Sequence, residues 1–107
     1  MSVESDIIAA VSSIAPCSAN TYTGTATTYF VIYADTIPAN FANDEPRSER
    51  FLIQLHFFCP ITTDTTTVRK QIKDAISAAG FSYPSMVNGG DDKTVRLIFE
   101  FEAIRST

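Results

Sequence analysis

Residues 51–60 read Phe-Leu-Ile-Gln-Leu-His-Phe-Phe-Cys-Pro, and this stretch decides the fold. Its odd-numbered positions, from Phe51 to Cys59, are all apolar, whereas its even-numbered positions mix apolar and polar side chains. Because successive side chains of a strand point to opposite faces, the pattern predicts a strand with one fully apolar face. Pro60 ends this strand, since proline has no N–H to donate to a sheet.

Other strands are predicted on both sides of this stretch. Tyr29–Tyr33 is built of aromatic and β-branched residues, and Thr94–Ile104 alternates apolar with polar side chains. The segment 81–87 predicts a short strand, which Pro84 places at an edge or a bulge. Residues 17–28 are rich in Ser, Thr and Asn and fit either a ragged strand or a loop.

Two segments have the apolar spacing of helices. The first runs from Val3 to Ile14 and is expected to stop at Pro16. The second follows Asp64, a candidate cap, and ends at Gly80, which suits a left-handed helix terminus. With the strands, these helices predict an α+β fold, in which a mostly antiparallel sheet of four or five strands carries two helices on one face.

Composition indicates one globular domain that spans residues 1–107, since 45% of the residues are apolar and 19% are charged. The net charge of −4 disfavours sequence-specific binding to nucleic acid, which needs a basic face. No apolar run approaches membrane-spanning length, and the acidic start of the chain is unlike a signal peptide. We therefore expect no membrane partner. Cys17 and Cys59 are expected to be reduced thiols, because two isolated cysteines suggest neither a disulfide scaffold nor a zinc site.

Two connections stand out. Ala34–Ser48, which contains two prolines, predicts a loop of about 15 residues, a length typical of binding elements. Phe41 within it is expected to dock on a partner, because it is an aromatic residue in a polar segment. Asn88–Asp92 predicts a hairpin turn in which left-handed conformers are available.

The second face of the predicted sheet is more apolar than a solvated face usually is. It has two interpretations: scattered surface residues, which are common, or a subunit interface. Two glutamates two residues apart on the last strand share this face, where they mark a solvated or subunit-lined surface. The apolar and histidine candidates for the interface are Leu52, His56, Phe58 and Ile98, and the two glutamates are Glu100 and Glu102.

No motif in the chain specifies an active site. His56 is the only histidine, and a proton shuttle with Glu100 or Glu102 is the one catalytic arrangement available to it. Zinc needs three or four ligands, which one histidine and two distant cysteines do not supply. Asn88-Gly89-Gly90 is not followed by a helix, as a phosphate-binding loop would be. We expect neither catalysis nor a cofactor nor a metal.

Four stretches together resemble small proteins of tailed phages and prophages, of the tail terminator or tail-completion type. The resemblance spans about residues 29–102. It rests on the order of its motifs rather than on one diagnostic signature. The stretches are Tyr29–Asp35 with Asn43–Pro46, then Ile53–Pro60, then Arg69–Ile72 with Ala79–Pro84, and finally Val95–Glu102.

The resemblance implies a structural virion protein without catalytic residues. Tail terminators are α+β proteins that form a hexameric ring, cap the tail tube and join it to the head. The implied partners are other copies of the chain, the tail tube, and head-completion or neck proteins, in the virion tail or neck after assembly in the host cytoplasm. Phe41, Asp44 and Glu45 would reach a neighbour, and Glu100 and Glu102 would line a channel and repel DNA.

Three alternatives remain open at this point. A neck or head–tail connector component shares the same size and charge. A small regulatory α+β domain that binds a ligand would need a concave polar pocket, which no motif specifies. An enzyme built on His56 and Glu100 comes third.

Overall fold

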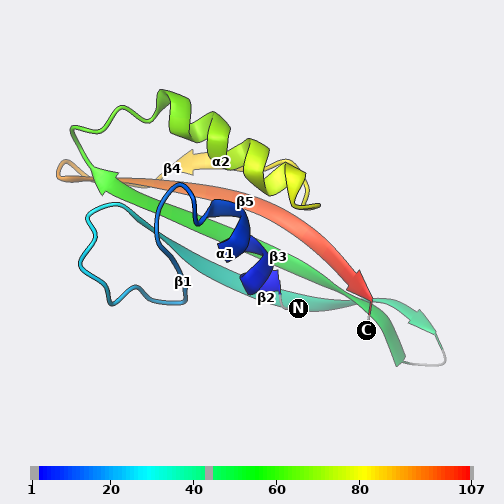
Figure 1. Cartoon of the computed structure of the whole chain (residues 1–107). Coiled ribbons are helices and arrows are strands. Elements are labelled where there is room, and N and C mark those ends of the chain that lie inside the picture. The colour runs from blue at the N-terminus through cyan, green and yellow to red at the C-terminus, as the bar shows by residue number, and fades with distance from the viewer. Residues whose placement is uncertain (1–2, 43–44, 107) are drawn as a thin grey trace.

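The fold consists of two helices and one five-stranded sheet (Figure 1). The computed structural model describes residues 3–42 and 45–106, without the side chains of residues 37–42, 45–49, 105 and 106. The sheet order is β1-β2-β3-β5-β4, with every pair antiparallel except β1 and β2. The predicted α+β fold is therefore confirmed, with one parallel strand. The elements are α1 (Val3–Val11), β1 (Cys17–Ala19), β2 (Tyr29–Ala42), β3 (Glu45–Pro60), α2 (Thr66–Ala78), β4 (Ser85–Asn88) and β5 (Thr94–Ser106).

The strand predicted from residues 51–60 becomes the centre of the sheet. β3 pairs with β2 on one side and with β5 on the other, so that Leu55 lies between Ile32 and Phe99. All three of these side chains are at most 1% exposed. The odd-numbered side chains of β3 thus face the core, as the alternation predicts.

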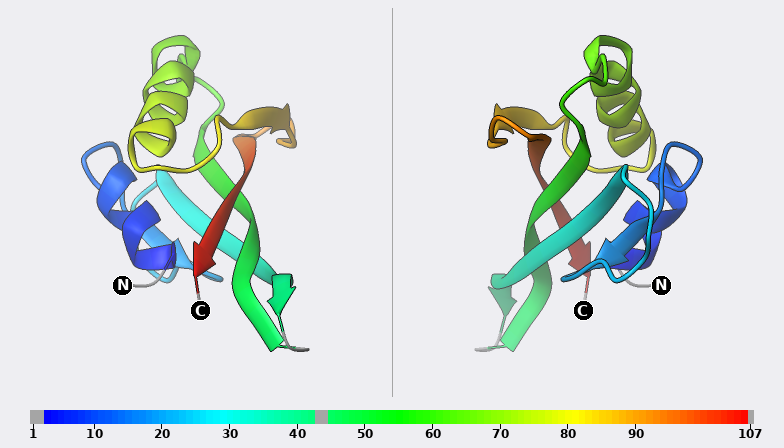
Figure 2. Two further views of the ribbon diagram at one scale, coloured as in Figure 1. Left: turned by 90° about the vertical axis from the view of Figure 1, so that its right-hand side faces the viewer. Right: turned by 90° about the vertical axis from the view of Figure 1, so that its left-hand side faces the viewer.

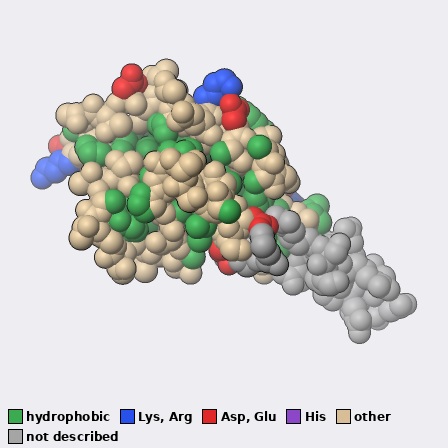
Figure 3. Space-filling view, viewed as in Figure 1, with side chains coloured by type: hydrophobic (Ala, Val, Ile, Leu, Met, Phe, Trp, Pro, Cys, Tyr) green, Lys and Arg blue, Asp and Glu red, His purple; other side chains and the backbone are tan. Residues whose placement is uncertain are grey.

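Both helices pack on the same face of the sheet, as expected, and Figure 2 shows this in profile. Each helix contributes an apolar stripe to a single core cluster with the strands. Figure 3 views this helix-covered side and shows only separate apolar spots, with the charged side chains mostly near the margin. Neither helix has the length and hydropathy needed to cross a bilayer in the described part of the chain. The helix residues buried in the core are Val3, Ile7 and Val11 of α1 with Ile72 and Ile76 of α2.

The helix ends differ in detail from the predictions. α1 ends at Val11, well before Pro16, and the chain then turns. Thr65 rather than Asp64 occupies the N-cap of α2, but the Asp64 carboxylate accepts a hydrogen bond from the N–H of Thr66 at 3.0 Å. Gly80 follows the helix at φ +96°, the left-handed conformation that was expected of it.

The predicted loop Ala34–Ser48 is wrong, because most of it is strand. β2 continues to Ala42 and β3 starts at Glu45, so the two strands form one long hairpin. The prolines that suggested a loop lie where a sheet tolerates them. Pro46 pairs with Phe41 beyond the last contact of β3 with β5, so it has a neighbouring strand on one side only.

Pro38 fits into β2 because the N–H and C=O groups of successive residues point alternately toward β3 and away from it. The N–H of Phe30 donates to Pro16 and the carbonyl of Ile32 accepts from Asn20, so even-numbered residues of β2 turn their polar groups away from β3. Pro38 continues this series beyond the end of β1, where no strand lies beside β2 in the described chain. Its missing N–H therefore costs no ladder hydrogen bond.

The hairpin makes the molecule elongated. Its extents are 54 × 26 × 24 Å and its radius of gyration is 14.9 Å, whereas a compact domain of this length has a radius of about 13 Å. Figure 1 shows β2 and β3 running past both helices and past the end of β5. The hairpin end thus forms an arm of the sheet that no helix covers.

The turn between β4 and β5 is held by side chains rather than by left-handed residues. Neither Gly89 nor Gly90 has a positive φ, so the turn does not use the left-handed conformers that the sequence makes available. The Asp91 carboxylate instead accepts hydrogen bonds from the N–H groups of Lys93 and Thr94, at 2.9 and 2.8 Å. Gly90 is needed for space, because a Cβ there would lie 2.5 Å from the Thr94 carbonyl oxygen.

The two faces of β3 give a direct test of this architecture. Leu55→Ala removes a side chain that is 0% exposed, so we expect the free energy of unfolding to fall by about 2–5 kcal/mol. Leu52→Ala, on the opposite face where Leu52 is 36% exposed, should cost less than about 1 kcal/mol. Urea denaturation of both variants measures the difference. Equal losses would contradict the assignment of the two faces.

Candidate functional site

The face of the sheet that carries no helix is the candidate functional site, and we call it the open face. The register places its side chains in rows that cross β2, β3 and β5, with β4 at one end. Its members come from alternate positions of each strand. They are Tyr29, Val31, Tyr33 and Asp35 of β2, Arg50, Leu52, Gln54, His56 and Phe58 of β3, Ser85 and Val87 of β4, and Arg96, Ile98, Glu100, Glu102 and Ile104 of β5.

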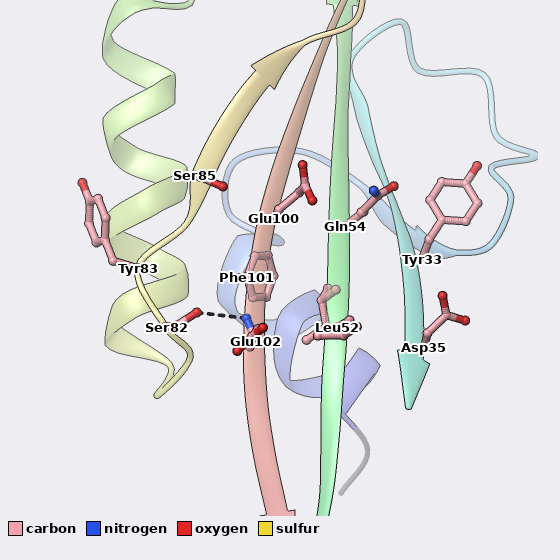
Figure 4. A pocket seen from close by; sticks show the side chains of 11 residues that line it. Tyr33, Asp35, Leu52, Gln54, Ser82, Tyr83, Ser85, Glu100, Phe101 and Glu102 are labelled. Atoms are coloured by element: carbon pink, nitrogen blue, oxygen red, sulfur yellow. Dashed lines mark hydrogen bonds between the residues drawn. The ribbon is translucent and has the colours of Figure 1, made fainter. Parts of the chain in front are cut away.

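A cleft of about 570 Å³ hollows this face (Figure 4). β2, β3 and β5 form its floor, and the segment that leads from α2 into β4 forms one wall. Ser82 fixes that wall to β5: its N–H donates to the Glu102 carbonyl at 3.1 Å, and its hydroxyl accepts from the Glu102 N–H at 2.9 Å. Tyr33 and Tyr83 lie on opposite sides of the cleft.

The cleft is acidic. Asp35, Glu100 and Glu102 line it, whereas no lysine or arginine does. Glu102 forms an ion pair with Arg50 of β3, and both side chains are half-exposed. Within the described part of the chain, Asp35 and Glu100 have neither a hydrogen bond nor an ion pair through their carboxylates. Two unpaired negative charges therefore face the cleft.

A polar network runs along the open face from Gln54, which lines the cleft, across the next two rows to Arg96. The Nε–H of Arg96 donates to Nδ1 of His56 at 2.9 Å, and Nε2 of His56 lies 3.1 Å from Oε1 of Gln54. A guanidinium can only donate, so Nδ1 of His56 must be the acceptor, and the imidazole proton sits on Nε2. The network thus fixes a neutral histidine in one tautomer.

The pKa of His56 is lowered from 6.5, first by burial and then by the charge of Arg96. The side chain is 4% exposed, although it belongs to the open face, because its own neighbours cover it. The ring of Tyr33 packs edge-on against the imidazole, with centroids 4.8 Å apart. His56 therefore holds its neighbours in place and presents little surface of its own.

Stacked rings extend from the network toward the β4–β5 turn. Tyr29 lies between Tyr22 and Phe58, with ring centroids 4.3 and 4.8 Å away. The guanidinium carbon of Arg96 lies 5.2 Å from the centroid of the Phe58 ring. This stack buries aromatic surface that a bare sheet face would expose, and it orders Tyr22 of the segment between β1 and β2.

Both cysteines are thiols with suppressed reactivity. Burial raises the pKa of Cys17 to about 12 and also raises that of Cys59. A thiolate is the form that attacks substrates and binds metals, so neither side chain is prepared for that chemistry at neutral pH. Residues 3–42 and 45–106 contain no cluster of three metal-binding side chains.

The structure brings part of the predicted interface set together. Leu52, His56, Phe58 and Ile98 share the open face, where Leu52 is exposed, Phe58 and Ile98 are half-buried and His56 is buried. Glu100 and Glu102 lie on the same face, opposite Gln54 and Leu52. The predicted contacts of Phe41, Asp44 and Glu45 lie outside what the structure describes, since it gives neither the residue Asp44 nor the side chains of the other two.

The catalytic pairing considered for His56 is not formed. Ile98 is its cross-strand neighbour, and its hydrogen bonds go to Arg96 and Gln54 rather than to a carboxylate. Strand alternation places Arg96 on this face from the sequence, and it could have placed Tyr33 there as well. No sequence signal could have placed Tyr83, because the irregular chain after α2 carries it to the cleft.

Comparison with known proteins gives the fold and no more. No protein-family model matches the chain, and no curated protein matches it. A solved structure whose name describes no function covers 99% of this chain and 97% of its own, with a TM-score of 0.61 and 14% identical residues. At that identity the likeness shows a shared fold over the whole length.

The His56 network predicts a pH dependence of stability. Its pKa is lower in the folded chain than the ordinary 6.5, so between these values the unfolded state holds a proton that the folded state lacks. Lowering the pH through this range therefore destabilises the fold, and the loss is absent above 6.5. Urea denaturation from about pH 5 to about pH 7.5 measures the slope.

His56→Gln is the control for this prediction, because it removes the titrating group. The difference in unfolding free energy between the original chain and His56→Gln should grow as the pH rises toward 6.5 and then stay constant. A difference that does not change with pH would show that His56 titrates alike in the folded and unfolded chains.

Proposed function

We propose that this chain is a structural virion protein of a tailed phage or prophage, which forms a ring that ends the tail tube and joins it to the head. The proposal starts from the resemblance of residues 29–102 to tail terminators. These residues make up β2, β3, α2, β4 and most of β5. The resemblance therefore concerns the sheet and one helix, and leaves out α1 and β1.

The helices cover only one face of the sheet, and this observation carries the proposal. Tyr33, Leu52 and Val87 on the open face are 39%, 36% and 52% exposed, although a sheet face in water is normally polar. Exposed apolar side chains around a cleft favour contact with another protein. A ring subunit needs such a surface, because it must bind a neighbour on each side.

The hairpin of β2 and β3 supports the same proposal. Its two strands extend beyond the helices, where the chain contributes no second layer to the sheet. A strand pair that extends past the helices in this way suits contact with a neighbouring subunit or with the tail tube. In this proposal the partners are other copies of the chain, the tube and the neck proteins, in the virion and, before assembly, in the host cytoplasm.

Acidic side chains would serve such a ring in one of two ways. Facing the channel, they would repel the phosphates of passing DNA. Facing a neighbouring subunit, they would pair with its basic residues. Glu100 cannot do both, because a carboxylate covered by a neighbour does not face the channel.

The mass in solution tests this function. A hexameric ring of the 11.7-kDa chain has a mass of about 70 kDa, six times that of one copy. Light scattering across a concentration series should give that mass, or tail tubes should carry the ring where assembly needs them as a template. An 11.7-kDa monomer at every concentration, which also fails to bind tail tubes, would contradict the proposal and favour the ligand-binding alternative.

A further inference from the structure

The open face lacks the second layer that would complete this fold. α1 and α2 cover one face of the sheet, and the described chain supplies no helix for the other. Exposed apolar side chains and two unpaired carboxylates meet there in the cleft. A partner for this surface must therefore offer both apolar surface and positive charge.

We propose that the open face binds helix α2 of a second copy of the chain, in a head-to-tail contact. This inference rests on the proposed ring and names the surfaces that join its subunits. The cleft residues Asp35 and Glu100 of one copy would face Lys70 and Lys73 of the next. Each copy would thereby give the neighbouring sheet the helix that it lacks.

Charge decides against the simpler pairing of two open faces. In a symmetric contact of two clefts, the unpaired carboxylates of Asp35 and Glu100 would meet the same carboxylates of the partner. Such like-charge contacts destabilise an interface. The open face therefore selects a different, basic surface as its partner.

Helix α2 carries that basic surface. Lys70 is exposed on its outer side and Lys73 is half-buried on its flank, whereas Ile72 and Ile76 are buried against the sheet. Arg69 lies nearer the sheet, where its Nε–H donates to the Thr65 hydroxyl at 3.0 Å. Lys70 is exposed and held only by an ion pair with Asp74 one helical turn away, at 2.7 Å. Surface pairs of this kind are weak, so Lys70 can exchange partners at little cost.

The cleft can hold an ammonium group through the carboxylates of Asp35 and Glu100, which attract its charge. Tyr33 and Tyr83 stand at the two sides of the cleft with their rings turned outward (Figure 4). The Tyr83 ring lies near an ammonium group within one copy, where Nζ of Lys73 is 6.0 Å from its centroid. A lysine of a second copy would meet carboxylates that no group of the described chain pairs with.

The placement of the two surfaces gives the contact a direction. α2 and the open face lie on opposite sides of the sheet, as the profile views show (Figure 2). A contact between two different surfaces leaves one of each unoccupied in a dimer, so further copies add head to tail, and a ring forms where the rotation from copy to copy closes. A ring of identical subunits requires a contact of this head-to-tail kind.

A charge exchange tests the contact. One variant carries Asp35→Lys and Glu100→Lys, and the other carries Lys70→Glu and Lys73→Glu. Each variant alone should fall from about 70 kDa, the mass of six copies, to the mass of the monomer, because like charges then meet at every contact. An equal mixture should regain the ring mass, since each variant restores the complementary surface for the other.

Two controls lie in the β4–β5 turn, away from both surfaces. Asp92→Lys and Lys93→Glu make charge changes of the same kinds at exposed positions and should leave the ring mass unchanged. Circular dichroism should show that both double variants are folded. The return of the ring mass in the mixture tests this as well, because only folded subunits can assemble. Glu102 is left in place because it pairs with Arg50.

The outcomes separate this inference from the proposed function. Rings of the original chain that persist in both double variants would overturn the contact and leave the function standing. Folded variants that lose assembly but do not recover on mixing would also overturn it. A chain that stays monomeric with and without tail tubes would overturn the function and the contact together.

Discussion

The whole molecule depends on β3 being apolar on one face and mixed on the other. Its odd-numbered side chains meet both helices in the core, and its even-numbered ones form the middle of the open face. β3 also pairs on both sides, with β2 and with β5. A shift of one residue in either pairing would exchange the two faces and bury Gln54 in place of Leu55. The burial of this strand therefore fixes the register of its neighbours.

The open face is ordered by its own polar and aromatic contacts rather than by a covering layer. Arg96, His56 and Gln54 hold one another, and stacked rings continue the row toward the turn. His56 stays neutral because burial and Arg96 both disfavour its charged form. The polar groups in this part of the open face thus have hydrogen-bond partners within the chain. The cleft beside it keeps unpaired carboxylates, which is why we place the partner there.

The arm shows why local sequence signals fail over residues 34–48. Two prolines and several polar residues predict a loop, because these residues disfavour the interior of a sheet. In the folded chain Pro38 directs its missing N–H away from β3, and Pro46 lies beyond the reach of β5. Pairing along a long hairpin then outweighs weak local propensity. Only the position of each proline relative to its neighbouring strands makes the segment compatible with a strand.

The sequence alone determined the periodic features of this protein. Alternation fixed the two faces of β3 and β5, helical spacing fixed the buried stripes of α1 and α2, and Pro84 predicted an edge position or a bulge where β4 forms the edge. These features are local, because each depends on side chains a few residues apart. The tertiary structure decided what depends on distant segments meeting. It made β1 parallel to β2, extended the hairpin, gave His56 its hydrogen-bond partners and brought Tyr83 to the same cleft as Glu100. Residues so far apart in the chain meet only through packing, which no local pattern encodes.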